Sequence, residues 1–148
     1  MMLPEIWSYE LFETYVPTEW NFMKSLRNTT DYESYSGRKN YADNTVGGYY
    51  TVRLAVLEKL KELKKQASVL ALRFITDEYT MPLGVWVTRE ATRKSMSSNP
   101  IEFSSKELMF EYARKLIKWK FNYNADYLLN ESRLLKNIKQ QTKLEKFL

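Results

Sequence analysis

The spacing of apolar positions predicts one helix more clearly than any other element of this chain. Between Tyr50 and Ala67, apolar residues recur at steps of three and four, and lysine and glutamate occupy the opposite side. Directly afterwards, Ser68 to Ile75 is almost continuously apolar, which is typical of a short buried strand. A helix followed so closely by a strand indicates a mixed layer of helix and sheet.

Weaker patterns predict a second strand, further helices and the loops between them. Residues 9–16 alternate polar and apolar side chains and end before Pro17, which predicts a strand. Residues 28–48 are dense in Asn, Asp, Ser and Thr and hold three of the four glycines, which predicts a loop. We expect a helical turn or two over 20–26, a turn over 77–84, and helices over 85–96 and 126–138.

A further helix is predicted to begin near Ser104. Ser104 and Glu107 have the spacing of a capping box, in which both side chains satisfy free amides of the first turn. The helix is expected to run to about Lys120. Its predicted buried face consists of Leu108, Tyr112, Leu116 and Trp119.

These elements predict an α+β fold with a single domain, in which three to four helices pack on a small sheet. The chain of 148 residues has the length of one domain with a substantial core. We place the globular domain at residues 1–138 and a flexible C-terminal tail at 139–148. No apolar run approaches the roughly 20 residues of a membrane span, and the first residues lack a secretory pattern, so we expect a cytoplasmic protein without membrane contact.

The absence of histidine and cysteine narrows the available chemistry. Disulfides, thiolate nucleophiles, cysteine or histidine zinc sites and histidine general bases are excluded within this chain. Carboxylates, lysine, tyrosine and hydroxyl groups remain, and we lean against an enzyme without excluding one. The net charge of +5, with many basic residues between 101 and 148, is compatible with a polyanionic partner such as DNA.

Two segments are candidates for contact with nucleic acid. Arg38 and Lys39 lie in the loop that reaches Gly47-Gly48 and the strong helix, where backbone amides and a helix N-terminus could bind a phosphate. The alternative is that this glycine pair permits close packing. The second candidate places Trp86, Arg89 and Arg93 about one helical turn apart, so that a base could stack beside two cations.

Charged side chains also allow two other interpretations. Those arginines could join Arg53, Arg73, Glu58 and Glu90 in internal ion pairs, because charges within apolar segments need partners. A carboxylate-dependent nuclease or phosphodiesterase acting on DNA is the alternative function. Its candidate carboxylates are Asp31, Glu33, Glu58, Asp77, Glu78 and Glu90. Their spacing fits no metal motif, and we expect neither a metal nor a cofactor.

The last eight residues resemble the peptide with which DNA-processing proteins bind the sliding clamp, PCNA. Gln141 would supply a polar contact, and one helical turn would bring Leu144, Phe147 and Leu148 to one side. The alternative is the end of an amphipathic helix on the protein's own core. Five polar residues at 139–143 interrupt that apolar stripe, which favours the detached peptide.

A series of short motifs resembles the C-terminal part of the archaeal Nre family of DNA repair proteins. The series comprises Gly37-Arg38 with Tyr41-Ala42, Gly47-Gly48-Tyr49-Tyr50, Arg53-Leu54-Ala55-Val56 with Glu58, Pro82-Leu83-Gly84-Val85-Trp86, and Arg89-Glu90 with Arg93. The resemblance runs in order over most of residues 5–148, and family members are similar in ending with a clamp-binding octad.

This resemblance implies a DNA repair accessory protein that binds the sliding clamp through its C-terminal peptide, contacts DNA and works at the nucleoid. The resemblance implies no catalytic residues for this chain. Two departures separate this chain from the family's pattern. Family members are longer and bear a cysteine-based zinc-binding segment, whereas this chain has no cysteine, and its octad ends in Leu148 instead of a second aromatic residue.

Overall fold

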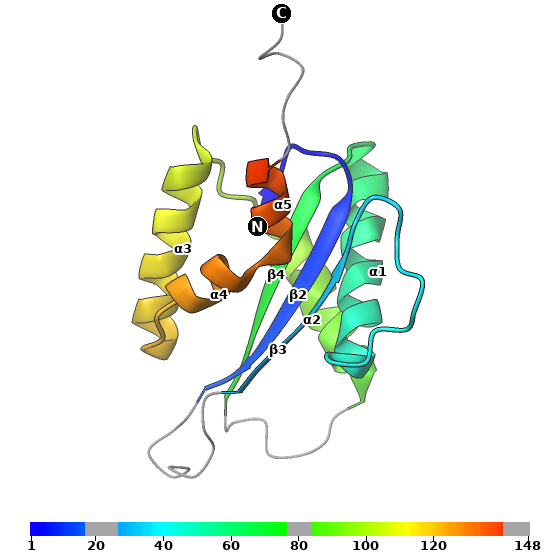
Figure 1. Cartoon of the computed structure of the whole chain (residues 1–148), viewed down its shortest axis with the longest axis horizontal. Coiled ribbons are helices and arrows are strands. Elements are labelled where there is room, and N and C mark those ends of the chain that lie inside the picture. The colour runs from blue at the N-terminus through cyan, green and yellow to red at the C-terminus, as the bar shows by residue number, and fades with distance from the viewer. Residues whose placement is uncertain (17–26, 77–83, 141–148) are drawn as a thin grey trace, which may run out of the picture.

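In the part of the chain that the structure describes, four strands form one mixed sheet with helices on both faces (Figure 1). The computed structural model describes residues 1–16, 27–76 and 84–140. The strands are β1 (Met2–Leu3), β2 (Ser8–Tyr15), β3 (Arg27–Glu33) and β4 (Ser68–Ile75). The helices are α1 (Val46–Leu63), α2 (Val85–Ser97), α3 (Lys106–Phe121), α4 (Asp126–Glu131) and α5 (Arg133–Gln140). The α+β prediction is therefore confirmed.

The strand order is β1-β4-β2-β3. At the centre, β2 is parallel to β4, with Ser8 beside Ser68, and the two hydroxyl groups are joined by a buried hydrogen bond of 2.9 Å. β2 is antiparallel to β3, and the two-residue β1 is antiparallel to the start of β4. A parallel pair requires a long connection between its strands, and the connection from β2 to β4 contains β3 and α1.

Each face of the sheet has its own apolar core, because successive side chains of a strand point to opposite faces. Figure 1 shows α1 and α2 on one face and α4 and α5 on the other. The α1 side buries Tyr9, Leu11, Tyr49, Val52, Val56 and Val69. The opposite side buries Phe12, Leu70, Ile117, Leu128 and Leu134.

The sequence prediction of a loop over residues 28–48 was wrong at its start, where β3 occupies Arg27–Glu33. β3 pairs with β2 over its whole length, so backbone pairing stabilises a segment whose composition is polar. Its buried carboxylates, Asp31 and Glu33, make polar contacts with the chain around α1 in place of apolar packing.

The predicted buried face of α3 was also wrong. Trp119 is 80% exposed, Leu108 and Tyr112 are exposed, and the side that packs on the core carries Ile117. The helix has two neighbouring apolar stripes, and periodicity could not tell which of them meets the sheet. Its N-cap is Ser105, not Ser104, because the Ser105 hydroxyl accepts the hydrogen bond from the Leu108 amide at 3.2 Å.

The last predicted helix is two helices that meet at Ser132. The buried carboxylate of Glu10 lies at this junction and accepts hydrogen bonds from the Ser132 hydroxyl, the Arg133 amide and the Leu134 amide. It therefore caps α5 from the neighbouring strand. The break explains why the described part of the chain has five helices where three to four were expected.

The other predicted elements agree in type, with shifted ends. β4 has the predicted bounds, whereas α1 begins at Val46, four residues before the predicted start, and ends at Leu63. The helical turn expected over 20–26 lies outside the described residues, as do residues 77–83 of the turn expected over 77–84. Within the described ranges, no helix has the length and apolarity to cross a membrane.

Candidate functional site

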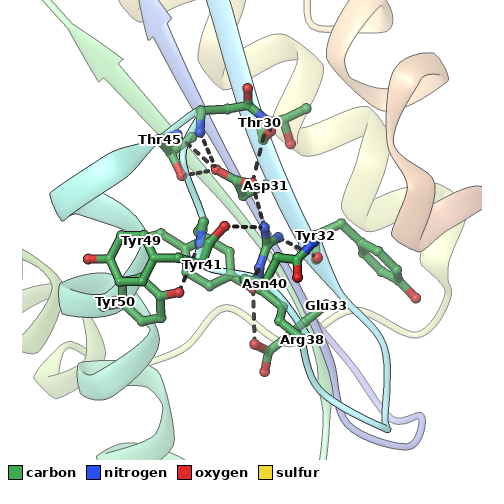
Figure 2. Close-up of polar contacts among 12 residues, drawn as sticks. Thr30, Asp31, Tyr32, Glu33, Arg38, Asn40, Tyr41, Thr45, Tyr49 and Tyr50 are labelled. Atoms are coloured by element: carbon green, nitrogen blue, oxygen red, sulfur yellow. Dashed lines mark hydrogen bonds and ion pairs between the residues drawn. The ribbon is translucent and has the colours of Figure 1, made fainter.

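A buried carboxylate organises the approach to α1 (Figure 2). The Asp31 side chain, on β3, accepts hydrogen bonds from the amides of Asn44 and Thr45 at 3.0 and 2.8 Å and from the Thr45 hydroxyl at 3.0 Å. It also lies 3.1 Å from a guanidinium nitrogen of Arg38. The negative charge at the start of α1 is thus supplied by the protein itself.

Arg38 is held within this network. Its guanidinium donates hydrogen bonds to the backbone carbonyls of Tyr32, Asn40 and Tyr41 at 2.9, 3.1 and 3.2 Å. It also lies over the ring of Tyr49, 5.2 Å from the centroid. Arg38 therefore closes the loop between β3 and α1, and its neighbour Lys39 is the exposed cation of the pair.

A second buried carboxylate lies two residues along β3. Glu33 accepts hydrogen bonds from the Trp7 indole, the Tyr49 hydroxyl and the Arg53 guanidinium at 2.9, 3.0 and 2.9 Å. Burial first, and then the charge of Glu33, raise the pKa of Tyr49 far above its usual value. Tyr49 therefore stays protonated and donates to the carboxylate.

The glycine pair at the start of α1 lies in close packing. A Cβ atom at Gly47 would overlap Val85 of α2, and one at Gly48 would overlap the Glu13 carboxylate. Glu13 forms an ion pair of 2.6 Å with Arg73 of β4. With carboxylates from β2 and β3 beside this helix start, the geometry favours the packing interpretation over a phosphate site.

This packing makes Gly47→Ala a test of the α1–α2 contact. We expect the free energy of unfolding to fall by about 1–2 kcal/mol, because overpacking costs about 1–3 kcal/mol and alanine returns up to about 1 kcal/mol of helix propensity. Urea denaturation measures the change. Lys61→Ala, at an exposed position of the same helix, is the control. A Gly47→Ala variant as stable as that control would contradict the close contact.

The exposed surface of α2 carries the second group of predicted residues. Arg93 forks between two carboxylates, with its nitrogens 2.6 Å from Glu58 and 2.7 Å from Glu90, and Arg89 lies 3.0 Å from Glu90. A hydrogen bond from Arg93 lowers the pKa of Glu58. Hydrogen bonds from Arg89 and, to a smaller extent, Arg93 lower the pKa of Glu90. Trp86 is 60% exposed one turn earlier on the helix.

The α2 arginines agree in part with both interpretations, the ion network and the nucleic-acid surface. Arg89 and Arg93 form ion pairs with Glu58 and Glu90, and they lie at the surface near the exposed Trp86 indole. The inner arginines are elsewhere, since Arg53 pairs with Glu33 and Arg73 with Glu13.

The candidate carboxylates for a nuclease do not converge in the part of the chain that the structure describes. Asp31 and Glu33 face α1, whereas Glu58 and Glu90 bind Arg93 on the outside. No group of three or more Asp, Glu, His or Cys residues among residues 1–16, 27–76 and 84–140 is placed to hold a metal ion. Asp77 and Glu78 lie outside those ranges, as do the clamp-binding candidates Gln141, Leu144, Phe147 and Leu148.

Sequence reasoning missed two structural carboxylates, Glu10 and Glu13. Both lie in β2, whose side chains are buried from Ser8 to Thr14. The available signal was their position inside a strand that pairs on both sides, where a charge needs a partner. Their partners, at Ser132 and Arg73, are too distant in sequence to be read from a local pattern.

Comparison with known proteins identifies the family. The profile of the family described as "Archaeal Nre, C-terminal" matches residues 33–147, and the chain belongs to this family. It is 33% identical over 144 residues to DNA repair protein NreB of Archaeoglobus fulgidus, an alignment that covers 96% of this chain and 35% of that protein. The resemblance found in the sequence motifs is confirmed.

Two further relatives are named DNA repair protein NreA. The protein from Archaeoglobus fulgidus is 39% identical over 105 residues, covering 71% of this chain and 27% of the relative. The one from Haloferax volcanii is 38% identical over 96 residues, covering 63% and 23%. The chain thus spans about a third or less of the length of these relatives. No solved structure matches it.

Proposed function

We propose that this protein acts in DNA repair and binds the DNA sliding clamp, PCNA, through residues 141–148. The proposal rests on two observations taken together, the family of the chain and the pattern of its last eight residues. The relatives are named DNA repair proteins, and the final residues have the glutamine, aliphatic and bulky pattern of a clamp-binding peptide. Such a protein would work in the cytoplasm at the nucleoid.

The packing of α5 supports a peptide that begins beyond the domain. Leu134 and Leu135 are buried in the core, and Ile138 packs against it. Lys139 and Gln140, the next two residues, are exposed. The apolar side chains by which α5 contacts the domain therefore end at Ile138, three residues before Gln141, which supports a peptide separate from the core.

Contact with DNA is the second part of the proposal. Lys39 and Trp86 are exposed, and the indole could stack on a base of single-stranded DNA while Arg89 meets the backbone. Arg38, Arg89 and Arg93 already have carboxylate partners, so they contribute less free charge than their sequence positions indicate. Binding to the clamp would keep this domain near DNA and so raise its local concentration there, which would contribute more than its own DNA contacts.

Replacement of Phe147 by alanine tests the clamp interaction. We expect the whole chain to bind an archaeal PCNA with a dissociation constant around micromolar, and Phe147→Ala to weaken binding at least about thirtyfold, as loss of an apolar anchor does. Isothermal titration calorimetry measures both. Lys146→Ala, next to the anchor, is the matched control and should bind within about threefold of the unaltered chain. Equal heats for Phe147→Ala and the unaltered chain would remove the proposal.

A further inference from the structure

Among residues 1–16, 27–76 and 84–140, no strand pairs with the outer edge of β4 along most of its length. β1 pairs only with Ser68 and Val69 of this eight-residue strand. Met1 extends the pairing by one position, since its amine donates to the Leu70 carbonyl at 2.8 Å and its carbonyl accepts from the Leu70 amide at 3.0 Å. The side chains of β4 are buried over its first three residues and half-buried from Ala71 onward, where the described neighbour ends.

The next backbone groups on this edge belong to Leu72 and Phe74. Alternate residues of a strand direct their N–H and C=O groups to opposite edges, so these two face the same way as Leu70. The intervening residues face β2, as the hydrogen bond from the Val16 amide to the Ile75 carbonyl demonstrates. An edge of this kind is the template for β-strand addition.

A groove of about 520 Å³ lies between this edge and α2. One wall is β4 from Val69 to Ile75, and the other is a side of α2 with small or apolar residues, including Val87, Thr88, Ala91 and Ser95. Small side chains on that wall leave room for the alternate side chains of a strand laid beside β4. Edge and groove together supply backbone partners and an apolar pocket.

We propose that this β4 groove binds an extended polypeptide segment that pairs antiparallel with β4, in line with β1. Its occupant is the polypeptide that precedes this domain in the longer members of the family. The direction of β1 supports that occupant, because a strand that continues from Leu3 back through Met1 runs along Leu72 and then Phe74.

The relatives supply such a polypeptide. The matched family region is described as C-terminal, and the alignment with NreB of Archaeoglobus fulgidus covers nearly all of this chain but 35% of that protein. Most of the relative's chain therefore precedes the region aligned here. The residues that enter the domain would arrive at the open half of β4. This inference is independent of clamp binding.

Amide hydrogen exchange tests the proposal. The probe is the part of Archaeoglobus fulgidus NreB that precedes its matched region, produced as a separate polypeptide and added to the whole chain. We expect the Leu72 and Phe74 amides to exchange at least about tenfold more slowly when it is bound. The Ala71 and Arg73 amides, which face β2, should change little.

Filling the groove should prevent binding. Ala91→Trp places a large side chain on the α2 wall at an exposed position, and we expect at least about tenfold weaker binding in calorimetry. Ser104→Trp, exposed and outside the groove, is the matched control and should bind normally. Phe147→Ala should also bind normally, which separates this result from failure of the clamp proposal.

Three outcomes would overturn the inference. The first is no binding of the NreB polypeptide to the intact chain. The second is protection confined to another surface, such as the exposed side of α3 that carries Trp119. The third is self-association, in which sedimentation velocity finds a dimer that protects Leu72 and Phe74 without any polypeptide, so that a second copy occupies the edge.

Discussion

Glu10→Ala is expected to lower the free energy of unfolding by about 3 kcal/mol, because a buried donor left without its acceptor costs about 1–3 kcal/mol and three donors lose theirs. Glu10 is fully buried, and its carboxylate accepts from the Ser132 hydroxyl at 2.5 Å and from the Arg133 and Leu134 amides at 3.0 and 3.1 Å. Alanine leaves these donors unsatisfied inside the protein and removes the cap of α5. Urea denaturation followed by circular dichroism measures the loss.

Glu10→Gln is the matched control, because it keeps the shape and one acceptor oxygen, and it should cost less than alanine. It also tests the pH dependence. Burial raises the pKa of Glu10 above 4.5, outweighing the opposing hydrogen bonds from Ser132, Leu134 and Arg133. The folded state therefore binds the proton more tightly than the unfolded state.

The sign of this effect follows from linkage. The contribution of Glu10 to stability is fully present below pH 4.5 and is lost as the pH rises through the raised pKa of the folded state. Glu10→Gln should remove that part of the pH dependence. Unfolding curves between pH 4 and 7 with the same slope in both proteins would contradict the assignment, as would an alanine variant no less stable than the glutamine variant.

Asp31→Ala is expected to cost about 3 kcal/mol, because it leaves Arg38 without its carboxylate partner and frees the donors of Asn44 and Thr45 at the start of α1. The effect should be partly local. Amide exchange at Thr45 should accelerate more than exchange at Val56, in the middle of the same helix. Chemical denaturation gives the total loss, and exchange measured by NMR gives its distribution.

Lys39→Ala is the comparison for this variant. Lys39 is exposed and adjacent to Arg38, and its removal should change stability by no more than about 0.5 kcal/mol. If Asp31→Ala were as stable as Lys39→Ala, the Asp31 contacts would not be what holds the loop to α1.

Much of the fold could be predicted because its main elements differ in apolar period. The continuous run of β4 and the three- and four-residue steps of α1 are strong signals, and both elements occur, β4 with the predicted bounds and α1 four residues earlier at each end. β3 could not be predicted in this way, since its buried side is polar and is satisfied from α1. The break between α4 and α5 depends on Glu10, which is remote in sequence.

Residue type indicated that the arginines form ion pairs, but not how the pairs are arranged. The predicted network was internal and included Arg53 and Arg73, whereas the observed one joins Arg89 and Arg93 to Glu58 and Glu90 at the surface of α2. Arg53 and Arg73 pair with Glu33 and Glu13 instead. Arg38 was proposed for nucleic acid but binds Asp31 and three backbone carbonyls. Those contacts depend on the pairing of β3 with β2, which no local pattern reveals.

The central strand pair also bears on how the chain acquires its structure. Ser8 pairs with Ser68 across α1 and β3, so joining β2 to β4 closes a long stretch of chain, whereas joining β2 to β3 closes a shorter one. Loop-closure entropy grows with the length enclosed, and non-local pairing slows folding. Pairing β2 with β4 therefore has the larger loop-closure entropy cost. When α1 forms first from its local contacts, less disordered chain remains between the two strands, and that cost is smaller.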